Sequence, residues 1–292
     1  MERIDDILLT RDGWRLPITA FLPQAPVERV LVVGAAIGAH RERYYPFAEH
    51  MAHSGWGVVT FTYRGLGETS PLPEAPAATL VDWGREDLTH IIDWAEQHFP
   101  QATLYGVLHS ISGELIGLAS NHSKLSAAAA ISTPRHLWSL WKGYYRYVVR
   151  VFFCLIIPFG VWCKGRLRLS KVTPLYDLPS DVALQWADVG LNEAPDTHGF
   201  QLAKKGFEQY RTPTLFVSFE DDRGIAPEAT VEYLRTHFYQ NAYTEHFHIR
   251  PEAVGAKKIG HSGFFDGQVG AQWWDELGQR LQAIAGTGHA SR

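Results

Sequence analysis

The chain has 292 residues, of which 46% are hydrophobic and 20% are charged, and this composition excludes a disordered or fibrous protein. A chain of this length forms one large domain or two small ones, and its two cysteines exclude a disulfide-rich scaffold. The net charge of −4 argues against a nucleic-acid-binding protein. Residues 1–6 lack the basic and apolar pattern of a secretory signal, so we expect a cytoplasmic protein.

Apolar strands and amphipathic helices alternate along the first part of the chain. The dipeptide Asp12-Gly13 separates two β-like runs and predicts a tight hairpin turn, because glycine tolerates a positive φ. Strands that alternate with helices indicate a parallel sheet with crossover helices. In chain order the pattern predicts strands at 29–33, 57–61, 102–108 and 127–132, and helices at 45–54, 80–98 and 111–119.

The alternation stops at Pro134 and resumes near the C-terminus. There the pattern predicts a strand at 214–219, a helix at 227–238, a strand at 243–249 and a helix at 270–281. The predicted fold class is therefore α/β, with a mostly parallel central sheet flanked by helices. We expect a discontinuous core and an inserted, mostly helical cap or lid. The core would be residues 1–133 and 206–292, and the cap residues 134–205.

The inserted segment differs in charge from the rest of the chain. Between Leu115 and Tyr176 there are nine Lys or Arg residues and no Asp or Glu. Apolar residues recur at helical spacing over 136–157, with cations on another face, so we expect a cap helix with a solvated basic side. The alternative is a face that docks on anionic lipid or holds an anionic substrate. The longest uncharged run, 151–163, has 13 residues and contains Pro158. A membrane span needs about 20, so we expect none.

A candidate nucleophile lies where a predicted strand runs into a predicted helix, at 108–113. A serine on such a sharp turn projects above the sheet, and the next N–H points at a developing oxyanion. Ser110 has this position. The usual Gly-x-Ser-x-Gly elbow has glycine where Leu108 and Ser112 stand, so the motif alone does not distinguish a nucleophile from a helix cap.

Two later loops carry the other residue types that a serine nucleophile needs. Asp221 and Asp222 follow the strand at 214–219, and His261 follows the strand at 243–249. All these groups fall at the C-terminal ends of strands, where ligands bind in open parallel sheets. The order of serine, acid and histidine therefore predicts a catalytic triad.

These motifs resemble those of the α/β-hydrolase superfamily and, more narrowly, of a bacterial group of predicted α/β-hydrolases. The resemblance covers nearly the whole chain, and the chain departs from the family pattern at Leu108 and Ser112. The stretches that carry it are 62–67, 108–113, 177–179 with 185–186, 219–222 with 226–227, and 259–265.

The resemblance implies the α/β-hydrolase fold and a role for each site residue. Ser110 would be the nucleophile and His261 the general base. Asp222 would hold the imidazole in the correct tautomer, and Asp221 is the alternative acid. A one-residue shift at the end of the strand would exchange these two carboxylates.

The resemblance also implies an activity. Backbone N–H groups of Ile111 and Ala36 would form the oxyanion hole. The expected function is that of a serine hydrolase, similar to carboxylesterases and thioesterases, which cleaves a carboxylic ester or thioester through an acyl-enzyme. An apolar acyl or aryl group would bind under the aromatic, basic cap, with an anionic substrate as one option. The alternatives are an acyltransferase that uses the same triad and an inactive binding protein with this fold.

The sequence predicts no cofactor and no metal. The stretch from Gly65 to Gly67 lacks the third glycine and the helix start of a dinucleotide fingerprint. His246 and His248 share a strand face but have no third ligand nearby in the sequence. His109 should point away from the nucleophile, because side chains alternate along a strand. The expected partner is a small molecule, with no nucleic acid and with the cap as the surface for any peripheral membrane contact.

Overall fold

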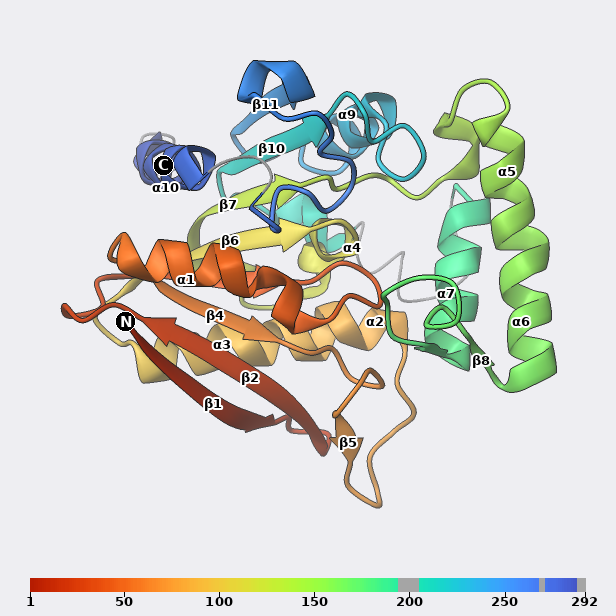
Figure 1. Ribbon diagram of the computed structural model, residues 1–292. Helices are drawn as coiled ribbons and strands as arrows, with labels where there is room; N and C mark the ends of the chain where they lie inside the picture. The colour runs from red at the N-terminus through yellow and green to blue at the C-terminus, as the bar shows by residue number, and fades with distance from the viewer. Residues whose placement is uncertain (194–204, 268–270, 288–292) are drawn as a thin grey trace.

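The computed structural model of the protein describes residues 1–193, 205–267 and 271–287. Within them one sheet forms the centre, with strand order β1-β2-β4-β3-β6-β7-β10-β11 (Figure 1). β1 and β2 form an antiparallel hairpin, β2 also pairs antiparallel with β4, and the strands from β4 to β11 are parallel. The strands are β1 (Glu2–Leu9), β2 (Trp14–Leu22), β3 (Arg29–Gly34), β4 (Gly57–Phe61), β5 (Ser70–Pro71), β6 (Thr103–His109), β7 (Leu125–Ile131), β10 (Thr214–Phe219) and β11 (Thr244–Ile249).

Burial explains why the inner strands have continuous apolar sequences. Every residue of β4 and β10 is buried, as is nearly all of β7, because helices cover both faces of the parallel part of the sheet. β1, at the edge, is almost wholly exposed. The predicted fold class is confirmed, and the predicted core strands lie within two residues of their expected bounds.

The helices of the core lie on both sides of this sheet. α1 and α10 lie side by side on one face, and α3 lies on the other (Figure 1). Residues 80–98 form one helical run with a π-turn in its middle, and the predicted helix at 111–119 continues after Leu115 as a 3₁₀ turn. The bounds are α1 (Tyr45–His53), α2 (Leu80–Asp82), η2 (Trp83–Leu88), α3 (Thr89–His98), α4 (Ile111–Leu115), η3 (Ile116–Leu118), α9 (Glu228–His237) and α10 (Ala271–Ala285).

After β7 the chain leaves the sheet and forms helices beside the C-terminal ends of the strands (Figure 1). Three consecutive elements, α5, η6 and α6, form one continuous helix over Tyr145–Lys164, which we call the cap helix. Residues 194–204 of the expected cap lie outside the described residues. The elements of this part are η5 (Trp138–Leu140), α5 (Tyr145–Val151), η6 (Phe152–Ile156), α6 (Ile157–Lys164), β8 (Arg166–Leu167), β9 (Leu178–Pro179) and α7 (Ser180–Leu191).

The cap helix corrects two expectations. It begins at Tyr145 rather than at His136, because His136 turns inward to a buried carboxylate and Gly143 breaks the helix with a φ of +60°. It also continues through Pro158, since the π-turn η6 just before this proline locally widens the helix. The resulting helix has 20 residues and is long and apolar enough to cross a membrane by length and composition. The short length of the uncharged run 151–163 was therefore not a sufficient reason to expect no membrane span.

Candidate active site

Ser110 occupies a strained turn between β6 and α4. Its φ of +55° and ψ of −117° are rare for a residue with a side chain, and among the described residues only Ser110 and Ser132 have a positive φ without being glycine. The turn is held because the Ser110 N–H donates to the carbonyl of Ile131 at 3.0 Å. This is the geometry of a nucleophile elbow, which presents its side chain at the end of the sheet.

A glycine on the neighbouring strand makes room for this elbow. Leu108 and Ser112 fill the positions that usually hold glycine, but Gly34 at the end of β3 faces both of them. A Cβ atom on Gly34 would lie 2.7 Å from the Cβ of Ser112, which is closer than side chains approach. Ser112 is then fixed by hydrogen bonds, since it donates to the carbonyl of Ala35 and accepts from the Tyr63 hydroxyl, both at 2.6 Å. The small residue that the elbow needs is thus provided by β3.

His261 and Asp222 form a hydrogen-bonded pair. The Nδ1–H of His261 donates to Oδ2 of Asp222 at 2.7 Å, and Asp222 is buried. Asp221 has a different task, because its Oδ2 accepts from the N–H groups of Ile259 at 2.8 Å and Gly260 at 2.9 Å. The structure therefore brings Asp222 to the imidazole, and Asp221 ties down the loop that carries it.

His109 forms a hydrogen bond that holds the loop of His261 in place. A carbonyl can only accept, so the His109 Nε2–H must donate to the backbone oxygen of His261 at 2.9 Å. His109 Nδ1 then accepts from the Tyr44 hydroxyl at 2.9 Å, and the same hydroxyl accepts from the Ala36 N–H at 2.8 Å. Burial and the neighbouring His261 hold the pKa of His109 well below its usual value, so the ring stays neutral. His109 is thus a positioning residue, a role that strand alternation alone did not reveal.

The two expected oxyanion donors differ in their availability. Ile111 is the first residue of α4, where helix geometry leaves the N–H without an intrahelical acceptor. The Ala36 N–H, in contrast, is already used by Tyr44, so the structure does not present it as a free donor. Ile37 follows in the same loop and, like Ala36, lines the cavity described next.

Ser110 and His261 open into one large cavity. Its volume is about 520 Å³, within the usual range for a small-molecule site. The Ser110 Oγ is buried and has no hydrogen-bond partner in the described structure, so the serine and the imidazole share this cavity without a direct bond. Most of the wall is apolar and comes from the segment between β7 and β10: Val148, Val149, Phe152, Phe153, Leu169, Val172, Leu175 and Trp186.

A buried ionic cluster lies behind the cavity wall, and sequence reasoning did not identify it. Glu114, on the helix after the nucleophile, accepts from Arg135 at 3.0 Å and from His136 Nδ1 at 2.7 Å. Burial alone would raise the pKa of Glu114, but the charges of His136 and Arg135 outweigh it and hold this pKa below its usual value. His136 lines the cavity, and its Nε2 is buried without a partner in the described structure, as is Nε1 of its neighbour Trp186. The adjacent Arg-His pair after Pro134 is the only local signal for this cluster.

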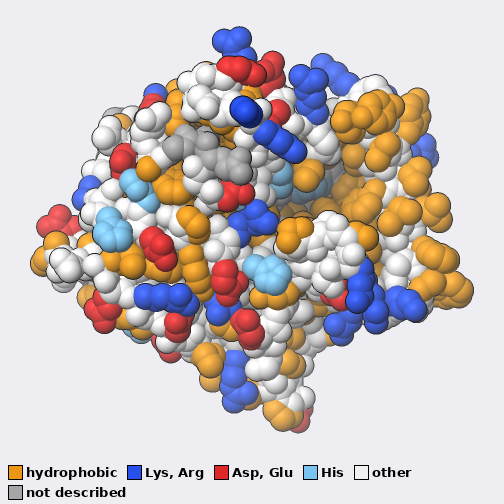
Figure 2. All heavy atoms as spheres, viewed as in Figure 1, with side chains coloured by type: hydrophobic (Ala, Val, Ile, Leu, Met, Phe, Trp, Pro, Cys, Tyr) orange, Lys and Arg blue, Asp and Glu red, His pale blue; other side chains and the backbone are white. Residues whose placement is uncertain are grey.

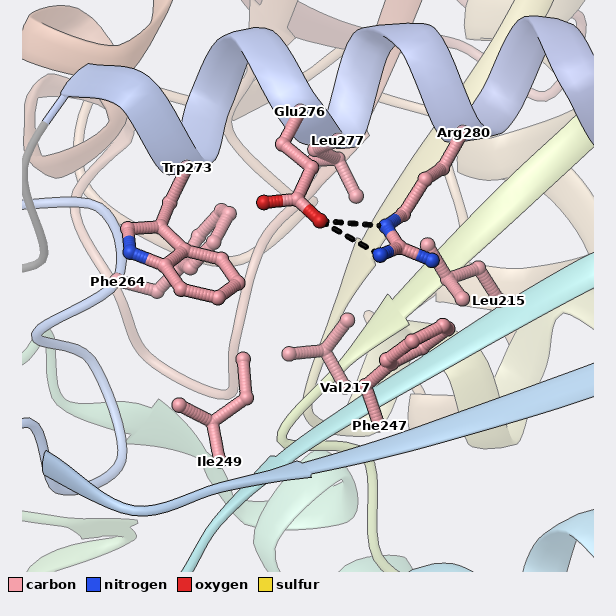
Figure 3. Close-up of a pocket in the computed structure, with 9 residues that line it drawn as sticks. All are labelled: Leu215, Val217, Phe247, Ile249, Phe264, Trp273, Glu276, Leu277 and Arg280. Carbon is pink, nitrogen blue, oxygen red and sulfur yellow. Dashed lines mark hydrogen bonds and ion pairs between the residues drawn. The ribbon is translucent and has the colours of Figure 1, made fainter. Parts of the chain in front are cut away.

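The remaining candidates do not form a second site. No group of three or more His, Cys, Asp and Glu within the described ranges could hold a metal ion. His246 and His248 both bond to the hydroxyl of Ser218 at 2.8 Å. A small cavity between α10 and the edge of the sheet, flanked by the Glu276–Arg280 ion pair, has about 20 Å³ and contains no predicted site residue (Figure 3). This is little more than the space of one water molecule.

The parallel sheet, the elbow after β6 and the His–Asp pair after later strands define the α/β-hydrolase fold. No protein-family model and no curated protein matches the sequence. Solved structures do match. They include Est1E from Butyrivibrio proteoclasticus with ferulic acid bound (14% identity, TM-score 0.64, 95% of this chain and 100% of that chain). An esterase from Pyrococcus furiosus has 16% identity and a TM-score of 0.61, covering 97% of this chain and 92% of that chain. A serine hydrolase homologue from Coxiella burnetii has 15% identity and a TM-score of 0.56, covering 96% and 98%. At these identities the likeness shows the fold.

Proposed function

We propose that the protein is a serine hydrolase that cleaves a carboxylic ester or thioester. The observation that carries this proposal is the strained Ser110, which shares a cavity with an imidazole oriented by a buried carboxylate. The presence of esterases among the proteins of similar fold supports it.

The chemistry follows the usual two steps of acyl transfer. Ser110 Oγ attacks the carbonyl carbon while His261 Nε2 takes its proton, and the imidazolium then protonates the leaving alcohol or thiol. Water, deprotonated by the same imidazole, attacks the acyl-serine and releases the acid. Asp222 stabilises the imidazolium and keeps its tautomer fixed. The Ile111 N–H would stabilise the oxyanion, together with the loop at Ile37, because the Ala36 N–H already donates to Tyr44.

The first experiment uses a fluorophosphonate probe, which reacts with activated serines. We expect wild-type protein to be labelled on the peptide that contains Ser110 and to hydrolyse p-nitrophenyl esters of short alkanoic acids. Product analysis with added alcohols or thiols then separates hydrolysis from acyl transfer. If the wild type is neither labelled nor active, the proposal fails and an inactive, ligand-binding protein is the better interpretation.

The cavity also suggests a polar feature of the substrate. Because His136 Nδ1–H donates to Glu114, its Nε2 and the Nε1–H of Trp186 are the two buried polar groups without a partner in the described structure. A hydroxyl on the acyl or aryl group can pair with both, since it accepts from Trp186 Nε1–H and either donates to or accepts from His136 Nε2. We expect His136→Phe to lower kcat/KM for a hydroxylated ester about tenfold relative to the unsubstituted ester. An unchanged ratio of the two rates would contradict this assignment.

A further inference from the structure

The outer side of the cap helix is an exposed apolar surface. Tyr147, Phe159 and Trp162 are 66%, 59% and 80% exposed, whereas aromatic side chains in soluble proteins are usually mostly buried. Figure 2 shows hydrophobic side chains gathered at the edge of the molecule where Figure 1 places α5 and α6. We call this surface the apolar face of the cap. Its exposed members are Tyr144, Tyr147, Val148, Val151, Leu155, Ile156, Phe159 and Trp162.

Positive charge stands at both ends of this face. Exposed cations precede or occupy the first turns of the helix, and others follow its last turn. The sequence has no acidic residue between Leu115 and Tyr176, and the first one after it, Asp177, interacts with Arg166 and Arg168. Exposed aromatic side chains with flanking Lys and Arg are the pattern of helices that lie in the headgroup region of an anionic membrane. The cations are Lys142, Arg146, Arg150, Lys164, Arg166, Arg168 and Lys171.

The helix lies along the protein rather than standing free of it. Phe153, Ile157 and Val161 are buried on its inner side, and Phe153 contacts Trp186 of α7. A helix held along its length in this way has the geometry of an in-plane amphipathic helix, about 30 Å long. The helix also lines the cavity through Val149 and Phe152, and Val148 of the outer face lines it too, so the same helix borders both the outer surface and the site.

From these observations we propose that the apolar face of the cap docks on an anionic lipid surface. Charge complementarity favours a membrane over a second copy of this chain, because two copies would bring like charges together at both ends of the face. The chemistry of the site adds a substrate class, and this part rests on the proposed function. The ester would be an apolar molecule that enters the cavity from the lipid along the cap helix.

The test measures co-sedimentation of the full-length protein with phosphatidylcholine vesicles, with and without phosphatidylglycerol. We expect binding that requires the anionic lipid and weakens with salt. The double variant Phe159→Glu/Trp162→Glu should bind at least about tenfold more weakly, because two carboxylates replace inserted aromatic rings. Arg166→Gln/Arg168→Gln should weaken binding to anionic vesicles about tenfold or more.

The matched control is Ile7→Glu/Leu9→Glu on β1. These two side chains are 59% and 56% exposed and lie outside the cap, and the control adds the same charge as the cap variant. We expect it to bind vesicles like the wild type. All three double variants should retain hydrolysis of a soluble p-nitrophenyl ester, because none of them alters a residue that lines the cavity.

Three outcomes would overturn the docking proposal. One is a wild type that hydrolyses the soluble ester but does not bind anionic vesicles. Another is equal loss of binding in the cap variant and the β1 control. The third is a wild-type dimer that the cap variant converts to a monomer, which would make this face a contact between copies. Vesicle binding without any ester hydrolysis would instead leave the docking surface standing and remove the substrate class.

Discussion

Replacement of Ser110 by alanine is expected to lower kcat/KM for p-nitrophenyl esters by about 10⁴-fold or more. The variant has no oxygen to attack the carbonyl, and only binding and the oxyanion donor remain. Asp222→Asn should have a loss of similar size, because an amide in this position no longer fixes the proton on His261 Nδ1. Steady-state kinetics of the purified variants measure both effects, and circular dichroism checks that they fold.

Ser132 provides a close control for the nucleophile. It is also buried, also has a positive φ and also has an Oγ without a partner in the described structure, but it does not line the cavity. We expect Ser132→Ala to retain nearly full activity and to lose no labelling by the fluorophosphonate. If Ser110→Ala were as active as Ser132→Ala, another nucleophile would have to be sought.

Removal of Glu114 is expected to have the largest effect on stability. Glu114→Ala removes the buried carboxylate that accepts from the Arg135 guanidinium, which is 1% exposed. It also leaves His136 Nδ1 without an acceptor. Breaking a buried ion pair by deleting one partner costs about 3–5 kcal/mol, so we expect a loss of this size in the free energy of unfolding. Urea denaturation followed by tryptophan fluorescence measures it.

Two further variants separate burial from charge. Glu114→Gln keeps the volume and some hydrogen bonds, so it should cost less than the alanine variant but still destabilise the protein. Glu96→Ala removes an exposed partner of Lys124 and should cost less than about 1 kcal/mol. Equal effects of Glu114→Ala and Glu96→Ala would show that the buried cluster does not stabilise the fold.

The sequence predicted the core well for a physical reason. Parallel strands covered on both faces require continuous apolar runs, and such runs stand out between helices of regular period, as in β4 and β10. The candidate triad residues could be predicted because each follows such a strand. The choice between Asp221 and Asp222 could not be made in this way, since it depends on which carboxylate meets the N–H groups of Ile259 and Gly260.

The rest depends on contacts between residues far apart in the sequence. The cap helix does not begin at His136 because the His136 side chain bonds to Glu114, which lies 22 residues earlier in the sequence. The loss of Ala36 as a free donor depends on Tyr44, whose hydroxyl also reaches His109, 65 residues away. Local periodicity contains no information on such pairs, so charged and polar residues that turn inward are what sequence reasoning missed.

The position of Gly34 has a consequence for how such proteins are recognised. The space that the turn at Ser110 needs depends on two adjacent strands. In this chain the residue without a side chain is on β3, and the residues with side chains are on β6 and α4. A search pattern confined to the residues around the serine will therefore pass over chains of this kind. A pattern would retrieve them if it allowed residues other than glycine on both sides of the serine whenever the neighbouring strand of the sheet ends in glycine. It would also predict that the two positions change together during evolution.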